Sequence, residues 1–93
     1  MYNKITKMKE LEKTLKALSN RRRLAIIKCL KGNKEMSVSA LATEIKLAFK
    51  STSRHLTVLR GANIVEGDQR NLSVFYSLAK EQVPVARYII SQL

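Results

Sequence analysis

The stretch that decides the fold lies at residues 39–62 and reads SALATEIKLAFKSTSRHLTVLRGA. Its apolar residues recur at helical spacing in two successive segments, which predicts a short helix over residues 40–46 and a longer one over residues 49–62. Ser39 has the side chain of an N-cap for the short helix, and Val38 can pack back on it as a staple. The core-facing side of the longer helix should consist of Phe49, Thr52, Leu56 and Leu59. Two helices joined by so short a turn are typical of a helix-turn-helix.

After this stretch, the spacing of the apolar residues changes from helical to alternating, and it becomes helical again near the C-terminus. Asn63 tolerates the left-handed backbone that ends a helix. Residues 64–66 and 72–78 then form two apolar-rich runs on either side of a polar, glycine-containing tip at residues 67–71, which predicts a β-hairpin. Pro84 suits the first turn of a final helix. The apolar stripe of that helix consists of Ala86, Ile89, Ile90 and Leu93.

Two further helices are predicted before the deciding stretch. The first ends near Ser19, because the helical spacing of its apolar residues stops there. Its apolar stripe consists of Met8, Leu11, Leu15 and Leu18. The second helix has Asn20 as its N-cap, and Gly32 and Asn33 end it.

The order of these elements predicts an α+β fold that is mainly α. We expect a winged helix-turn-helix of about five helices, with one β-hairpin wing between the fourth and fifth, in a single domain over residues 1–93. Residues 39–62 form the helix-turn-helix and residues 64–78 form the wing. In this architecture the helix after the turn enters a major groove of DNA and the hairpin flanks it.

The charge of the chain predicts a polyanionic partner. The 93 residues include 18 Lys and Arg against 7 Asp and Glu, which gives a net charge of +11. Residues 13–34 and residues 45–65 each contain several cations and no acid, whereas an ordinary solvated surface mixes both signs. The alternative is a basic surface that serves only solubility. The length excludes a large multi-layer enzyme, and no nucleophile with its base, paired carboxylates or phosphate-binding glycine loop is present, so we expect no catalysis.

Other classes of protein are excluded by composition. A single cysteine, Cys29, can build neither a disulfide framework nor a cysteine-rich zinc site. We interpret it as a small buried apolar residue, with one-cysteine redox chemistry or an intersubunit disulfide as the alternative. No apolar run is long enough for a membrane span, and no leader precedes the first helix, so we expect a cytoplasmic protein.

Four blocks of sequence carry a resemblance to a known family. They read ALSNRRRLAII at residues 17–27, EMSVSALA at residues 35–42, SRHLTVLR at residues 53–60 and VFYSL at residues 74–78. In this order and spacing they resemble the ArsR/SmtB family of winged-helix transcriptional repressors. The resemblance implies a homodimer that pairs through its first and last helices. Such a dimer represses transcription because it occupies an operator and sterically blocks polymerase, and it leaves the operator when an effector binds.

The chain departs from the family pattern at its metal sites. Ser37 and Ser39 stand where many members carry two cysteines, and the last helix offers Glu81, Gln82 and Arg87 without a histidine. We therefore expect no metal and no cofactor, and no change in operator affinity on adding zinc, cadmium or arsenite. Control would come from protein abundance, an unknown small ligand, a partner protein or oxidation of the cysteine.

The turn of the helix-turn-helix departs from the family as well. Lys46 replaces the usual turn glycine, and Arg21 replaces the usual proline that opens the second helix. A left-handed lysine would cost on the order of 1 kcal/mol, so we expect a turn of different shape.

Candidate DNA-binding residues lie on the longer helix of the deciding stretch and on the hairpin. Lys50 and Arg54 are one turn apart on the polar face of that helix, in reach of phosphates and base edges, and Arg54 can bridge guanine O6 and N7. His55 borders the core side and is either a packing residue or a phosphate donor. Arg70 resembles the family's wing arginine at the hairpin tip and can enter a narrow minor groove, unless it is a loop charge that contacts nothing. The remaining candidates are Ser51, Ser53, Thr57 and Gln69.

The apolar stripes of the first and last helices have too little chain to cover them, so we expect residues 1–18 and 80–93 to form a dimer interface. Its residues would be Met8, Leu11, Leu15, Ala86, Ile89, Ile90 and Leu93. The predicted function is a sequence-specific, homodimeric repressor on a palindromic operator in double-stranded DNA. The alternative is an architectural DNA- or RNA-binding module without sequence preference.

Overall fold

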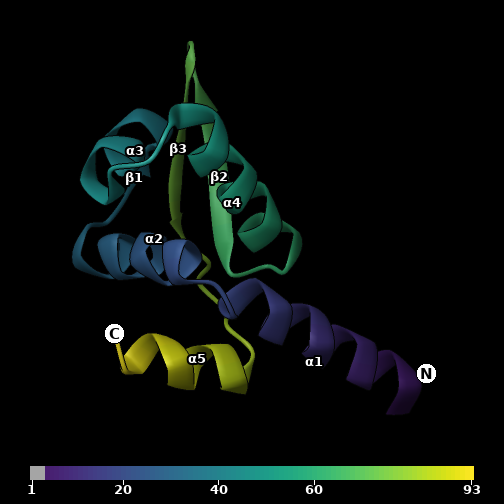
Figure 1. The fold of residues 1–93 in the computed structure, drawn as a ribbon. Helices are drawn as coiled ribbons and strands as arrows, with labels where there is room; N and C mark the ends of the chain where they lie inside the picture. Colours follow the sequence, from purple (N-terminus) through teal and green to yellow (C-terminus); the bar gives the residue numbers. More distant parts are fainter. Residues whose placement is uncertain (1–3) are drawn as a thin grey trace.

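The computed structural model describes residues 4–93, with side chains from residue 7 onward; residues 1–3 of the predicted dimerisation segment lie outside the described residues. The elements are α1 (Lys4–Leu18), α2 (Arg21–Gly32), β1 (Met36–Ser37), α3 (Val38–Ile45), α4 (Phe49–Gly61), β2 (Val65–Arg70), β3 (Ser73–Leu78) and α5 (Pro84–Ser91). Five helices with a hairpin between α4 and α5 confirm the winged helix-turn-helix. The hairpin and α1 project from the body in different directions, and α5 lies along α2 (Figure 1).

The starts of α2 and α3 are set by side-chain caps. Asn20 caps α2 as predicted, because its side-chain oxygen accepts hydrogen bonds from the backbone N–H groups of Arg22 and Arg23. The prediction that Ser39 caps α3 is wrong. Ser37 is the cap, and its hydroxyl accepts from the N–H of Ala40 at 3.1 Å. The cap moves two residues earlier because Ser37 is already extended in β1.

The strand β1 was not predicted. It pairs antiparallel with β3 through Met36 opposite Tyr76 and Ser37 opposite Phe75, so the sheet has the order β1-β3-β2. Two residues are too short to show the alternation that identifies a strand. The pairing ties the start of α3 to the hairpin.

The prediction that the turn between α3 and α4 differs from the family's glycine-containing turn is wrong. Lys46 adopts the left-handed conformation with φ 55°, like a glycine at this position. Two hydrogen bonds close the end of α3: the Leu47 N–H donates to the Ala42 carbonyl at 3.0 Å, and the Arg22 side chain donates to the Ile45 carbonyl at 3.0 Å. These bonds satisfy carbonyls that a helix end leaves open and offset the strain of the lysine. Asn63, with φ 60°, ends α4 in the left-handed conformation as predicted.

The hairpin is longer than predicted, and its tip is elsewhere. Residues Val65–Arg70 pair in register with Ser73–Leu78, which leaves Asn71 and Leu72 as the turn instead of residues 67–71. Gly67 lies in β2 opposite Tyr76, where a Cβ would come within 3.1 Å of the tyrosine ring. The glycine therefore allows the ring to pack closely and does not form the turn.

The core lies between α2, α3, α4 and the sheet, and α1 and α5 each add a few side chains. Its fully buried large side chains are Ile26, Ile27, Leu41, Leu56, Leu59, Ile64, Val65 and Thr52. Phe49, predicted to join this side of α4, is 57% exposed because it stands in the first turn, beyond the packed body. In the part of the chain that the structure describes, no helix has the length and apolarity needed to cross a membrane.

Candidate nucleic-acid interface

The outer face of α4 carries the polar residues singled out in the sequence. Lys50, Arg54 and Thr57 are exposed, whereas Ser51 and Ser53 are half-buried. The Thr57 hydroxyl donates to the Ser53 carbonyl at 3.1 Å, so part of its capacity is used inside the helix. The opposite face is anchored by three fully buried side chains, Thr52, Leu56 and Leu59. This anchoring holds the polar face outward in a fixed orientation.

The first turn of α4 is open to a ligand. The residue at its N-cap, Ala48, has no side-chain oxygen, so no side chain accepts from the first N–H groups of the helix. A helix N-terminus carries a partial positive charge, and Lys46 and Lys50 add two exposed cations on either side. Residues 45–65 contain no acid. This end of α4 therefore favours a negatively charged group.

His55 of α4 takes part in a hydrogen-bond network with α1 and α2. Its Nδ1 accepts a hydrogen bond from the Arg23 guanidinium at 3.2 Å, and the same guanidinium donates to the carbonyls of Ala17 at 2.6 Å and Lys16 at 3.0 Å. Burial of the imidazole, followed by the charges of Arg23 and Arg22, lowers the pKa of His55. The ring is therefore neutral at physiological pH, with its proton on Nε2 because Nδ1 accepts.

Three cations of the acid-free stretch at residues 13–34 close helix ends, a role that was not predicted from the sequence. Arg22 donates to the last carbonyl of α3, Arg23 to the last turn of α1, and Lys31 to the carbonyls of Ile90 and Ser91 at the end of α5. Each places a positive charge where a helix leaves carbonyls open. No local pattern reveals this, because the carbonyls belong to other elements. Part of the charge interpreted as a binding face thus serves the fold.

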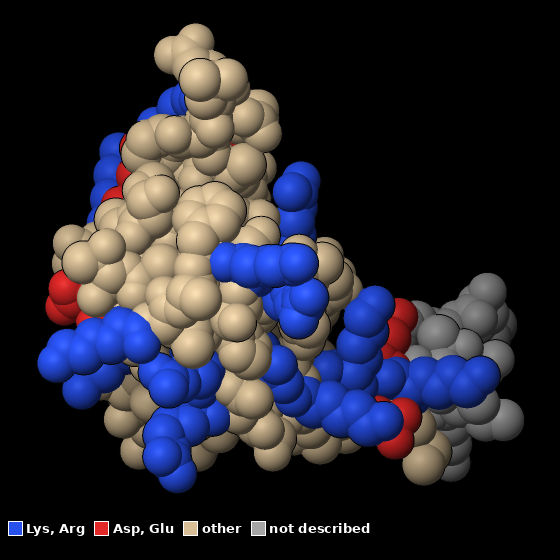
Figure 2. Space-filling view, turned by 45° about the horizontal axis from the view of Figure 1, so that its top comes forward, with Lys and Arg blue, Asp and Glu red and all other residues tan. Residues whose placement is uncertain are grey.

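Cations outnumber acids on one face of the molecule. Figure 2 shows Lys and Arg over the lower half of this face and beside its centre, with Asp and Glu at its left edge and near α1 at the right. Among the cations of the first stretch that close no helix end, Lys13, Lys16, Arg21, Lys28 and Lys34 are exposed, and Lys16 pairs with Glu12 at 3.8 Å. These cations attract a polyanion without reading its sequence.

The wing differs from the expectation for Arg70. This residue ends β2 one position before the turn, and Glu35 binds its guanidinium through two hydrogen bonds of 2.6 and 2.7 Å. Asp68 accepts from its Nε at 2.9 Å, and the guanidinium lies 4.8 Å from the centre of the Phe75 ring. The hydrogen bond from Arg70 lowers the pKa of Glu35. The arginine is therefore already paired and stacked.

The tip of the wing is uncharged. Asn71, with φ 53°, and Leu72 form the turn, and the Leu72 side chain is 100% exposed. Gln69 donates to the Asn71 carbonyl at 2.9 Å, which is turn chemistry. A wing of this kind presents an apolar side chain and amides at its tip.

The residues predicted for a dimer interface fall into three groups by exposure. Met8, Leu11 and Leu15 on α1 are 67%, 46% and 46% exposed. Ala86 is fully buried inside the protomer and has no side-chain surface for a partner, which corrects its inclusion. The half-buried residues of the C-terminal segment, Ile89, Ile90 and Leu93, pack partly against the core.

Two exposed apolar residues near α5 were missed because they lie outside its stripe. Val83 and Tyr88 are 53% and 64% exposed. An apolar groove of about 330 Å³ runs between α1 and the start of α5, lined by Leu11 and Thr14 on one side and by Val83, Pro84 and Val85 on the other. The charged residues Lys7 and Glu10 of α1 also line this groove, so its apolar part consists of Leu11 and the start of α5.

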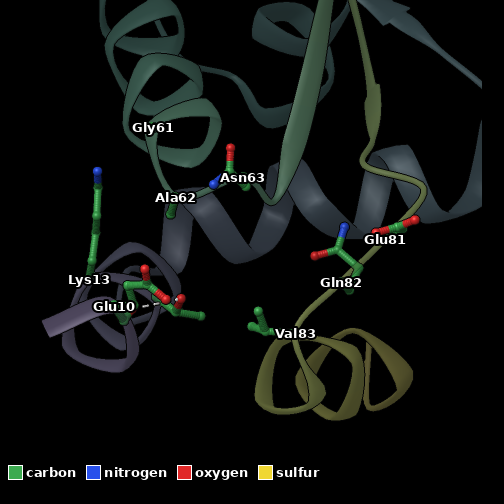
Figure 3. A pocket seen from close by; sticks show the side chains of 9 residues that line it. Glu10, Lys13, Gly61, Ala62, Asn63, Glu81, Gln82 and Val83 are labelled. Atoms are coloured by element: carbon green, nitrogen blue, oxygen red, sulfur yellow. Dashed lines mark hydrogen bonds between the residues drawn. The ribbon is translucent and has the colours of Figure 1, made fainter. Parts of the chain in front are cut away.

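A second pocket, of about 270 Å³, is lined by both polar and apolar residues. Figure 3 shows Glu10 of α1 on one side, Gln82 and Val83 on the other, and Ala62 and Asn63 above. The Gln82 side chain donates to the carbonyls of Ile64 and Ala79, which fixes the segment before α5.

Neither pocket contains a set of metal ligands. Within residues 4–93, no group of three or more His, Cys, Asp or Glu side chains is placed to hold a metal ion. Cys29 is half-buried, and burial, followed by the charge of Glu44, raises the pKa of its thiol, so little reactive thiolate forms.

Comparison with known proteins agrees with this geometry. Residues 20–67 match the family described as "Bacterial regulatory protein, arsR family". The transcriptional activator HlyU of Vibrio cholerae is 33% identical over 79 residues, which cover 85% of this chain and 72% of HlyU.

Two solved structures are also similar. The solution structure of the homodimeric winged helix-turn-helix DNA-binding domain of Mb0332 from Mycobacterium bovis has a TM-score of 0.83 at 29% identity, covering 96% of this chain and 80% of that one. The crystal structure of the transcriptional repressor BigR from Xylella fastidiosa has a TM-score of 0.74 at 29% identity, covering 96% and 87%.

Proposed function

The chain belongs to the arsR family of bacterial regulatory proteins, and from this we propose that it is a homodimeric repressor that occupies a palindromic operator in double-stranded DNA. The observation that carries the proposal is the outer face of α4. This face is rigidly anchored, free of acids and exposed at Lys50 and Arg54. Its task is binding, and we propose no catalysis.

Each residue of α4 has a role that follows from its geometry. Arg54 reaches the edge of a guanine and donates to O6 and N7, which makes it the main source of sequence preference. Lys50 pairs with a phosphate and adds affinity without preference. Ser51, Ser53 and Thr57 add hydrogen bonds at the sides of the helix. His55, through its Nε2 proton, donates to a phosphate while Nδ1 stays bound to Arg23.

The dimer forms through the apolar surface shared by α1 and α5. Leu11 and Leu15 on α1 contact the partner subunit, as do Val83 and Tyr88. Residues of the C-terminal segment that are half-buried in the protomer support this contact: Ile89, Ile90 and Leu93. The exposed apolar side chains and the groove between the two helices support this arrangement. A two-fold axis there would place the two α4 helices at half-sites about 34 Å apart, one turn of DNA.

We propose repression because a dimer seated on a promoter excludes polymerase. HlyU is named an activator and BigR a repressor, so relatives of this chain act in both directions. We place the protein in the cytoplasm, with its DNA. A reporter gene behind the selected operator tests the direction: its expression should fall when the protein is present, and a rise would indicate activation.

Selection of bound sequences from a pool of random duplexes tests the function itself. The proposal predicts a palindromic consensus. Recovery of unrelated sequences with equal affinity would instead support the architectural or RNA-binding module, which uses the same basic surface without sequence preference.

A further inference from the structure

An aromatic side chain stands exposed at the start of α4. Phe49 is the first residue of the helix and is 57% exposed, although the spacing with Thr52, Leu56 and Leu59 assigned it to the core. Those three residues are fully buried and complete the packed side of α4 without it. Phe49 is therefore available to a ligand of the helix.

The surroundings of Phe49 indicate what covers it. Lys46 and Lys50 are both exposed within one helical turn, and the N-cap Ala48 leaves the first N–H groups of α4 without a side-chain partner. Phosphates suit such surroundings, so a DNA backbone can approach this end of the helix closely. Side chains in a helix lean toward its N-terminus, which directs Phe49 past the end of the helix rather than along it.

We propose that Phe49 determines part of the DNA sequence preference by apolar contact with the C5-methyl group of a thymine in the major groove. The proposal rests on the proposed function and adds a base class to it. The N-terminal residues of a recognition helix contact base edges. Among the groups that base pairs present in the major groove, the thymine methyl is the apolar one, and a phenyl ring is a suitable partner for it.

Replacement of thymine by uracil tests the contact, because uracil pairs identically and lacks only the methyl group. Starting from the selected consensus duplex, each thymine of one half-site is replaced by uracil, and affinity is measured for the wild type and for Phe49→Ala. We expect one thymine at which uracil weakens wild-type binding about fourfold, the value for one buried methyl group. The same replacement should leave Phe49→Ala binding unchanged.

A matched control comes from Val58→Ala, which truncates another exposed apolar residue of α4 more than two turns from its start; it should keep the full response to uracil. Circular dichroism confirms that each variant is folded. Additive losses from uracil and Phe49→Ala at every position, or a wild type indifferent to all uracils, would overturn this proposal alone. A pool without any consensus would overturn the proposed function and this inference with it.

Discussion

Arg54 and Lys50 on α4 should contribute differently to DNA binding, Arg54 to sequence preference and Lys50 to affinity for any sequence. Arg54→Ala should cost about 1–3 kcal/mol of binding free energy and relax the choice of base at one operator position, because a bidentate contact is lost. Lys50→Ala should weaken binding to all sequences and reduce the salt dependence by about one unit, because one phosphate contact is lost. Titrations at several salt concentrations separate the two effects. Unchanged affinity and salt dependence in both variants would mean that α4 does not face the DNA.

The single histidine should make folding sensitive to pH. Burial and two nearby arginines lower the pKa of His55 below its ordinary 6.5, so the native protein binds a proton less readily than the unfolded chain. The stability that the neutral ring contributes is present above pH 6.5 and is lost as the pH falls through and below this value.

This pH dependence is measured by thermal unfolding at about pH 7.5 and about pH 5.5, on either side of the ordinary pKa of histidine. The wild type should lose more stability on acidification than His55→Gln, which keeps a polar side chain without the titration. An equal loss in both proteins would show that burial and the two arginines do not disfavour the charged ring. The chain has one histidine, so no other imidazole contributes.

At the scale of elements, the wing arginine should be kept from the DNA by Glu35, the residue before β1. Glu35 occupies both terminal nitrogens of Arg70, and we expect Glu35→Gln to make these nitrogens available to a phosphate, while Asp68 keeps the Nε, and to remove a negative charge beside the DNA. Affinity should rise, and the salt slope should steepen by about one unit.

Glu12→Gln is the matched control for this variant, since it removes an acid paired with Lys16 on α1 and leaves the wing intact. It should change affinity less than Glu35→Gln does. Weaker binding by Glu35→Gln would mean that the wing needs the ion pair to keep its shape.

The five helices and the hairpin could be predicted because their signals are local. Periodicity located the helices, the Asn20 cap fixed the start of α2, and alternation located the hairpin. Two of the failures depended on contacts that are distant in sequence. Gly67 was assigned to the turn because nothing near it reveals Tyr76 across the sheet, and the partner of Arg70 lies 35 residues away.

The candidate site shows the same limit. The polar face of α4 follows from helical spacing alone, so its residues could be named from sequence. The capping roles of Arg22, Arg23 and Lys31 could not, because they depend on which helix ends meet α2 in space. The exposure of Phe49 depends on where the packed body stops, which spacing does not give.

For the whole molecule, the apolar surface of α1 and α5 should control assembly. Leu11→Glu places a charge on a side chain that is already half exposed in the protomer, so the fold should survive while the dimer does not. Sedimentation at micromolar concentration should give about twice the chain mass for the wild type and the single mass for the variant. Leu72→Glu, at the fully exposed wing tip, should leave the mass doubled. A wild type that sediments as a monomer would contradict the proposed interface.

The central claim is that two α4 helices related by a two-fold axis read the major groove of one duplex. Guanine methylation interference on the selected consensus tests it most directly, because methyl groups at N7 block the edge that Arg54 is proposed to contact. We expect two symmetric clusters of interfering guanines on one face of the DNA, about 34 Å apart, and these guanines should no longer interfere in Arg54→Ala. A single cluster, or interference spread evenly along the duplex, would contradict it.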